Sequence, residues 1–348
     1  MSTTHPFRLS ALAALGVAAL ALAGCASGAP APAETGAAPA ADDPQALVPI
    51  HVIDVPQSKK VEIAAEQGFF EKHGLDVTVE YLATGSEILT AVQGGSAQLG
   101  YADVFGGLNA ISNGFDIQFI VSNNGHQKET AFAVLEDSPI QEPADLVGQT
   151  VGVLAVPQFI VAANAFLENN GVDPASVTFA QQRQQLAFPE AIGGGAVAGA
   201  PLPWNLFYSN QGQDGAFDFR LIGDPSNEGY LEPTATSAGF WSTTEWAEAN
   251  PDIAQAFADA LREYNTWWKG LSIEELQELN LEWYDIDYLA IAGDDEEAQE
   301  RLFRNDNLVS EGIDLAATDR WIQTGIRFSP DNVAAGVDFD AHVFESAR

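Results

Sequence analysis

The sequence predicts an α/β protein built from two similar parts, each a mostly parallel sheet flanked by helices. Strand and helix patterns alternate between residues 47 and 121, and the alternation begins again near residue 151. Such alternation is typical of parallel sheets, because a helix between two parallel strands returns the chain to the end of the sheet where it started. A short echo supports two similar parts, which we call lobes: GGSAQLG at 94–100 recurs as GGGAVAG at 193–199.

The run from Val61 to Phe105 carries the clearest pattern of the first lobe. Its predicted elements are a helix at 61–73, a strand at 77–81, a helix from 84 to 93 and a strand at 99–101. The first helix is expected to end at Gly74, because glycine adopts the left-handed conformation that is common at helix ends. Thr84 is a residue type that caps helices, and it predicts the start of the second helix.

Three further elements complete this stretch: a strand at 47–55, a helix at 105–113 and a buried strand at 117–121. Ligands of sheets with parallel strands bind beyond the carboxyl ends of the strands. We therefore expect the ligand site of the first lobe on the loops that leave those ends. The loops cover residues 55–58, 83–86, 101–105 and 122–125.

A strand at 130–135 is expected to carry the chain to the second lobe, where the alternation restarts. The pattern there predicts strands at 151–154, 177–179 and 196–200, with helices at 158–169, 186–192 and from 204. Residues 236–241 predict a returning strand. The last part of the chain predicts helices at 251–269, 273–283, 297–303 and 315–326. The first of these is amphipathic, and we expect its apolar face to pack on the first lobe.

The composition restricts the classes of function. The chain has 348 residues, a formal net charge of −35 and one cysteine. Its length suits two domains with a sizeable core. Nucleic acid is excluded as a partner, because a chain with 49 acidic and 14 basic side chains cannot neutralise phosphates. The acidic excess suggests a saline habitat, and a single cysteine excludes a disulfide within the chain.

The N-terminal segment indicates a leader. Arg8 precedes an apolar run that is too short for a membrane-spanning helix and ends in LAGC at 22–25. This ending is similar to the lipobox of bacterial lipoproteins, which implies a signal peptide at 1–24 and a lipid such as palmitate on Cys25. An ordinary secretory signal with a chance cysteine is the alternative. Residues 25–47 are rich in Ala, Pro and Gly and predict a flexible tether.

Several local sequences resemble one family. GFFEKHGLDV, TGSE and LGYAD in the first lobe, followed by DLVGQTVGVL and GVDPASVTF, resemble the substrate-binding lipoproteins of ABC importers. The chain is most similar to the branch that captures nitrate, sulfonates, taurine or thiamine pyrimidine precursors. The resemblance implies a two-lobe periplasmic-binding-protein (type II) clamshell, with lobe I at 48–136 and 237–348 and lobe II at 137–236.

The resemblance also implies a role. We expect a monomer anchored at the extracytoplasmic face of the cell membrane, which closes on a small molecule by bending near 130–138 and 232–238 and delivers it to an ABC permease. The same clamshell acting as a ligand sensor or adaptor for a membrane receptor is an alternative, since both roles use the same lobes.

A second alternative is an enzyme similar to the fungal pyrimidine-precursor synthase, whose cysteine-rich motif is absent from this chain. The five histidines lie apart in the sequence, and no Gly-x-Ser-x-Gly or Walker sequence occurs. We therefore expect no enzyme activity, no catalytic residues, no metal and no cofactor.

The candidate ligand-binding residues of the first lobe lie after predicted strands. They are Gln57, Ser58, Gly85, Ser86, Tyr101, Asp103 and Phe105. Polar groups at strand ends can orient a ligand, and aromatic faces can fill a cleft. Ser86 also begins a helix, where backbone N–H groups favour an anion, and plain capping of that helix is the alternative. For Asp103 the alternative is capping of the helix that follows it.

The remaining candidates are Gln158, Phe159, Trp204 and Trp241. We expect Trp204 to stack on the ligand, with core packing as the alternative. Pro157 has no N–H and its neighbours are apolar, which argues against an oxyanion at this turn. An aromatic nitrogen heterocycle or a cationic amine suits aromatic walls with Asp103 better. Arg183 argues for an anion if it reaches the cleft, so an anion of the nitrate, sulfonate or taurine type stays open.

Overall fold

The computed structural model describes residues 46–125, 132–211, 217–223, 231–304, 308–309 and 311–348, which belong to one compact unit. The expected signal peptide at 1–24, Cys25 and most of the tether at 25–47 lie outside the described residues, as does part of the expected bend at 130–138. None of the helices described has the length and apolar character needed to cross a membrane.

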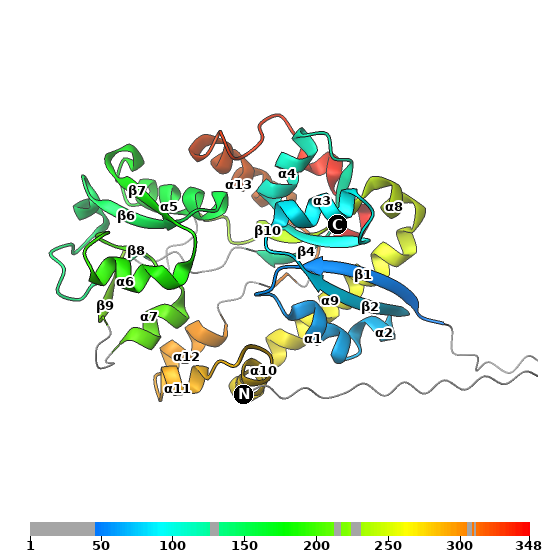
Figure 1. Ribbon diagram of the computed structural model, residues 1–348, viewed down its shortest axis with the longest axis horizontal. Coiled ribbons are helices and arrows are strands. Elements are labelled where there is room, and N and C mark those ends of the chain that lie inside the picture. The colour runs from blue at the N-terminus through cyan, green and yellow to red at the C-terminus, as the bar shows by residue number, and fades with distance from the viewer. Residues whose placement is uncertain (1–45, 126–131, 212–216, 224–230, 305–307, 310) are drawn as a thin grey trace, which may run out of the picture. The chain divides into compact units, whose positions relative to one another are not determined.

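The first sheet has five strands in the order β2-β1-β3-β10-β4 (Figure 1). They are β1 (Val48–Asp54), β2 (Leu75–Tyr81), β3 (Leu99–Asp103), β4 (Ile117–Gly125) and β10 (Thr236–Thr243). Strand β1 pairs in parallel with β2 and β3, whereas β10 is antiparallel to β3 and β4. Four strands therefore run in one direction, and their carboxyl ends meet at one edge of the sheet.

Helices cover this sheet and supply most of its core. They are α1 (Lys60–Glu66), α2 (Phe69–Lys72), α3 (Gly85–Gln93), α4 (Val104–Ser112), α8 (Thr244–Ala249), α9 (Pro251–Gly270) and α13 (Leu315–Phe328). The prediction for the apolar face of α9 is confirmed, since the helix contacts α2 and β4 and the Phe257 ring stacks on Phe70 with centroids 5.2 Å apart. The single helix predicted at 61–73 is wrong. Gly68 has φ +78°, and this left-handed residue separates α1 from α2.

The second lobe repeats the plan of the first. Its strands are β5 (Phe132–Leu135), β6 (Thr150–Leu154), β7 (Thr178–Gln182), β8 (Ala200–Pro201) and β9 (Phe219–Ile222), which form a three-stranded sheet β8-β5-β9 and a two-stranded sheet β6-β7. A single bridge joins these two sheets, and we call them together the second sheet. Strands β6 and β7 are parallel, a parallel bridge joins Val151 of β6 to Gly199 beside β8, and β5 is antiparallel to both β8 and β9. The order is therefore β7-β6-β8-β5-β9, again with one reversed strand. The expectation of two mostly parallel sheets flanked by helices is confirmed.

The helices of the second sheet are α5 (Pro157–Asn169), α6 (Phe188–Gly193) and α7 (Trp204–Asn210). A second group, which we call the C-terminal helices, follows α9: α10 (Ile273–Tyr284), α11 (Tyr288–Ala292) and α12 (Glu296–Phe303). Helices α11 and α12 pack on α7, and α13 packs on α5 (Figure 1). The C-terminal helices thus connect the two sheets on the side where α7 lies. Short 3-10 helices occur at Pro143–Leu146, Pro174–Ser176, Gln185–Ala187, Phe339–His342 and Glu345–Ala347.

Candidate functional site

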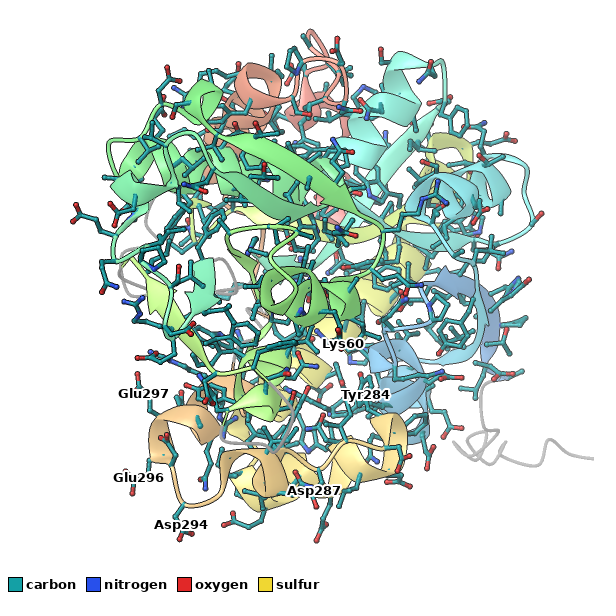
Figure 2. All side chains as sticks on the ribbon, turned by 60° about the vertical axis from the view of Figure 1, so that its left-hand side comes forward. Lys60, Tyr284, Asp287, Asp294, Glu296 and Glu297 are labelled. Atoms are coloured by element: carbon teal, nitrogen blue, oxygen red, sulfur yellow. The ribbon has the colours of Figure 1, made fainter. Side chains whose placement is uncertain are left out.

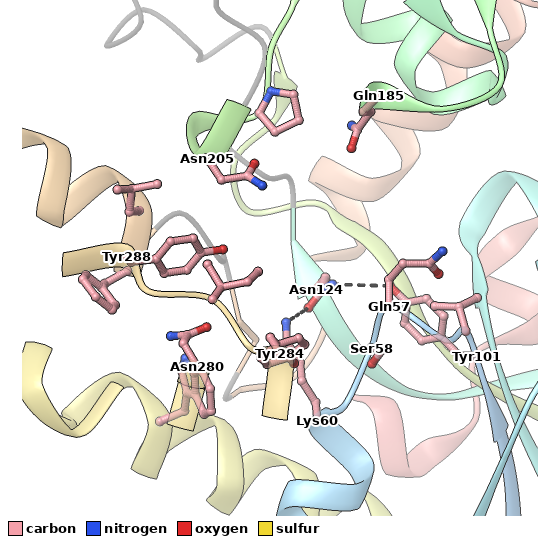
Figure 3. A pocket seen from close by; sticks show the side chains of 16 residues that line it. Gln57, Ser58, Lys60, Tyr101, Asn124, Gln185, Asn205, Asn280, Tyr284 and Tyr288 are labelled. Carbon is pink, nitrogen blue, oxygen red and sulfur yellow. Dashed lines mark hydrogen bonds between the residues drawn. The ribbon is translucent and has the colours of Figure 1, made fainter. Parts of the chain in front are cut away.

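A cavity of about 530 Å³ lies where the carboxyl edge of the first sheet meets the segments that follow β7 and β8 and the C-terminal helices (Figure 3). This volume is within the range of pockets that hold small organic ligands. The first sheet and the start of α1 contribute Val55, Gln57, Ser58, Lys60, Tyr101 and Asn124. The second sheet's segments contribute Gln185, Pro203 and Asn205, and α9 to α12 contribute Trp268, Asn280, Tyr284, Ile286, Tyr288, Leu302 and Phe303.

Three predicted residues, Gln57, Ser58 and Tyr101, line this cavity together. Gln57 and Ser58 follow β1, whereas Tyr101 lies on the adjacent strand β3. They meet because parallel strands end at the same edge of a sheet. Asn124, near the carboxyl end of β4, joins them and lies in one of the four loops expected to carry the site.

A hydrogen-bonded chain of side chains crosses the floor of the cavity. The Lys60 ammonium donates to the Asn124 side-chain oxygen at 3.2 Å, and the Asn124 amide nitrogen donates to the Tyr101 hydroxyl oxygen at 3.3 Å (Figure 3). Lys60 is 8% exposed. An ammonium group has three N–H donors, so Lys60 can hold Asn124 and a further acceptor at the same time.

Asp54 fixes the loop beneath this network. Its carboxylate accepts the Val55 backbone N–H at 2.7 Å and the Ser58 hydroxyl at 2.9 Å. Burial raises the pKa of Asp54 to about 6, although these hydrogen bonds and the charge of Lys60 act in the opposite direction. The Ser58 hydroxyl is therefore oriented toward Asp54, while the residue itself lines the cavity.

Aromatic side chains of α9 and the C-terminal helices form another wall. Four aromatic rings contribute to it, and they belong to Trp268, Tyr284, Tyr288 and Phe303. The Tyr288 and Phe303 rings meet edge to face with centroids 5.4 Å apart, and the Tyr284 hydroxyl accepts the Lys59 backbone N–H at 3.3 Å. The sequence analysis missed this wall, because aromatic residues in amphipathic helices have the same pattern whether they face a core or a cavity. It also missed Lys60, whose only sequence signal is a lysine in an acidic chain, a few residues after a strand end.

Trp204 lies next to the cavity but is not one of its lining residues. Its side chain is 4% exposed, and the Arg301 guanidinium lies over its ring at 4.5 Å from the centroid. Arg301 also donates to the Tyr208 hydroxyl at 3.1 Å. The neighbours Pro203 and Asn205 do line the cavity. Stacking of Trp204 on a ligand stays a prediction.

Four other candidates lie outside the large cavity. Phe159 lines a small pocket of about 10 Å³, which shares Gln185 and Pro203 with the cavity. Gln158 is half-buried in the first turn of α5, Gly85 is half-buried at the start of α3, and Ser86 is exposed. The residue that caps α3 is Thr84, which forms a capping box with Glu87. Arg183 is exposed and lines neither pocket.

Phe105 and Trp241 belong to the interior of the first sheet and its helices, and Asp103 is half-buried beside them. Asp103 caps α4 by accepting the Gly106 N–H at 2.9 Å, which is the alternative that the sequence left open. Burial raises the pKa of Asp103, and the backbone hydrogen bonds partly oppose this. The Phe105 ring stacks on Trp321 with centroids 5.6 Å apart, and the Trp241 indole N–H donates to the Ala102 carbonyl at 3.2 Å.

The chain matches one family model, described as NMT1/THI5 like, over residues 56–266. No curated protein sequence matches it. In the part of the structure that is described, no group of three His, Cys, Asp or Glu side chains is arranged to hold a metal ion.

Solved structures share the fold at low identity. The periplasmic aliphatic sulphonate binding protein SsuA from Escherichia coli is 17% identical with a TM-score of 0.66, over 86% of this chain and 98% of that chain. The alkanesulfonate-binding protein SsuA from Xanthomonas axonopodis pv. citri, bound to MOPS, is 17% identical with a TM-score of 0.60, over 86% and 99%. The DSZB C27S mutant in complex with biphenyl-2-sulfinic acid is 16% identical with a TM-score of 0.57, over 86% and 97%. The resemblance to periplasmic binding proteins, and with it the fold class, is confirmed.

Proposed function

Because the chain belongs to the NMT1/THI5-like family, we propose that it is an extracytoplasmic solute-binding lipoprotein of an ABC importer. It captures a small organic molecule in the cavity and delivers it to the permease. The observation that carries this proposal is the composition of the cavity wall, to which the first sheet, the segments that follow β7 and β8, and the C-terminal helices contribute. A molecule in this position contacts both halves of the protein at once.

The proposed division into lobes is 48–136 with 237–348 for lobe I and 137–236 for lobe II. The pairing of two strands supports this division. Strand β10, which begins at Thr236, pairs within the first sheet, whereas β5 pairs within the second. Bending of the two connecting segments, near 130–138 and 232–238, opens and closes the cleft. The ligand stabilises the closed form, because only that form offers it contacts from both lobes.

The proposed attachment is a lipid on Cys25 after removal of residues 1–24, with residues 25–47 as the tether. It holds a monomer at the extracytoplasmic face of the cell membrane, within reach of the permease. The proposed role is binding without a reaction.

Closure and stability test the proposal together. The purified protein is mixed with nitrate, taurine, methanesulfonate, benzenesulfonate or hydroxymethylpyrimidine, and its radius of gyration and thermal unfolding are measured. A ligand at one hundred times its dissociation constant should add about 2.7 kcal/mol of stability and reduce the radius of gyration. Asn205→Trp, which places a large ring in the cavity, should abolish both effects, whereas Ser209→Trp on the same helix should retain them. A ligand that stabilises the protein without any change in its dimensions would contradict closure.

A further inference from the structure

The charge of the cavity differs from the charge of the chain. The protein has 49 acidic side chains, yet the sixteen described residues that line the cavity include one lysine and no carboxylate. The exposed acidic run of Asp294, Glu296 and Glu297 lies at the outer face of the C-terminal helices, while Lys60 lies further inside (Figure 2). This acidic run is therefore directed to solvent, whereas the Lys60 ammonium is directed to the site.

Burial of the Lys60 ammonium costs free energy, which is unusual for a lysine with only a structural role. Its side chain is 8% exposed, and burial of an ammonium group is unfavourable unless polar partners surround it. Asn124 provides one such partner and is itself oriented by Tyr101. Asp54 is close enough for the charge of Lys60 to act on it, and its two oxygens accept the Val55 N–H and the Ser58 hydroxyl. An ammonium with three donors can keep its protein partners and still bind a ligand oxygen.

The rest of the cavity suits a planar apolar body. The rings of Trp268, Tyr284, Tyr288 and Phe303 offer faces and edges on which an aromatic ligand can pack. Asn205 and Gln185 lie across the cavity from Lys60 and Ser58 (Figure 3). A cavity of about 530 Å³ has the size of sites for drug-like molecules. Nitrate or taurine would leave most of this volume unfilled and would make no use of the aromatic wall.

We propose that the cavity selects planar aromatic monoanions, namely carboxylates or sulfonates carried on one or two rings. Lys60 binds the anionic group, Asn124 positions Lys60, and the aromatic wall binds the rings. This inference rests on the proposed solute-binding function and specifies its ligand. It also distinguishes between the two ligand classes that the sequence left open, in favour of an anion that retains an aromatic body.

Isothermal titration calorimetry of the full chain tests the ligand class with molecules of similar shape and different charge. The probes are naphthoate, naphthalenesulfonate, neutral naphthalenemethanol and cationic naphthylmethylammonium, together with taurine. We expect one or both aromatic anions to bind at least about tenfold more tightly than the neutral alcohol, as a charge-assisted hydrogen bond implies. Comparison of the affinities for the two anions shows whether the site prefers a carboxylate or a sulfonate. Neutral or cationic probes that bind as tightly as both anions would overturn the proposal.

The variant Lys60→Met tests the anchor. It should weaken binding of the preferred aromatic anion by about 10- to 100-fold while leaving the affinity for naphthalenemethanol unchanged. Lys59→Met is the matched control, because Lys59 pairs with Glu62 at 3.1 Å and lies over the Tyr81 ring outside the cavity. It removes the same charge from the adjacent position and should change the affinity less than about twofold.

A second variant keeps the anchor test independent of folding effects at Lys60. Asn124→Asp places a carboxylate beside the ammonium, and it should also weaken binding of the aromatic anion. Unchanged affinity of Lys60→Met and Asn124→Asp for the aromatic anion would show that Lys60 does not bind the anionic group. If taurine or nitrate closes and stabilises the protein while no naphthalene probe binds, the aromatic class is wrong and the solute-binding function stands.

Discussion

Asp54 is expected to make the protein less stable as the pH rises from acid toward neutral. Its side chain is 1% exposed, and burial raises its pKa from the ordinary 3.8 to about 6. The hydrogen bonds from Val55 and Ser58 and the charge of Lys60 lower this pKa, and the charge of Glu62 raises it slightly. The folded protein therefore keeps this proton to a higher pH than the unfolded chain. Where the folded state binds more protons, the free energy of unfolding falls as pH rises. This stability is present below about pH 4 and is lost by about pH 6 to 7.

The substitution Asp54→Asn removes the cost of ionising this buried group. The change in pKa corresponds to about 3 kcal/mol, because one pKa unit equals about 1.4 kcal/mol. Asparagine can still accept the Val55 N–H and bond to the Ser58 hydroxyl. We expect the variant to exceed the wild type in unfolding free energy by about 3 kcal/mol near pH 7.5, and the two proteins to converge toward pH 4.

Urea unfolding, followed by tryptophan fluorescence at several pH values, measures this difference. Asp76→Asn removes an exposed carboxyl from the neighbouring strand β2 and controls for the loss of one negative charge. A difference between Asp54→Asn and the wild type that stays constant from about pH 4 to about pH 8 would refute the reasoning. Such a result would mean that ionisation of the buried Asp54 carboxyl does not destabilise the folded protein.

Two further predictions concern packing. A Cβ added at Gly107 would lie 2.1 Å from the Trp241 ring, so Gly107→Ala should lower the unfolding free energy by about 1–3 kcal/mol. Gly270→Ala is its control, because the added atom there meets no neighbour within 4 Å. Equal urea midpoints for the two variants would contradict the contact. Arg301→Gln and Trp204→Leu, made singly and together, should show a coupling of about 1 kcal/mol from the cation over the ring. Effects that add within about 0.3 kcal/mol would show that the two side chains do not interact.

Local patterns predicted the elements whose signals lie within a few residues of each other. The start of α3 is one example, because Thr84 and Glu87 form a capping box that depends only on their spacing. The break at Gly68 was missed, since the apolar positions on both sides of it continue at helical spacing. Strand β9 was also missed. Its Arg220 donates to the carbonyls of Ser138 and Ile140, contacts that lie 80 or more residues away in the sequence.

The sequence likewise predicted some residues of the site and misplaced others. The sequence selected Gln57, Ser58 and Tyr101 because the carboxyl ends of parallel strands are where ligands bind, and these residues line the cavity. Phe105 was chosen by the same rule and Trp241 as an aromatic side chain for the cleft, but both are interior residues whose rings pack on Trp321 and Phe119. A position near a strand end does not fix the direction of its side chain, because that direction depends on the elements packed against the strand.

The sequence by itself determined the α/β class, the alternating order of elements and the family, because these depend on residue spacing and on local motifs. Only the tertiary structure decided which side chains share a cavity. Tyr284 and Tyr288 reach it because α10 and α11 return more than 220 residues later to the start of α1, where the Lys59 N–H meets the Tyr284 hydroxyl. Lys60 acquires its role from the same meeting of distant segments. An ammonium group is an ordinary surface charge in the sequence and becomes a binding group only when burial removes competing water from it.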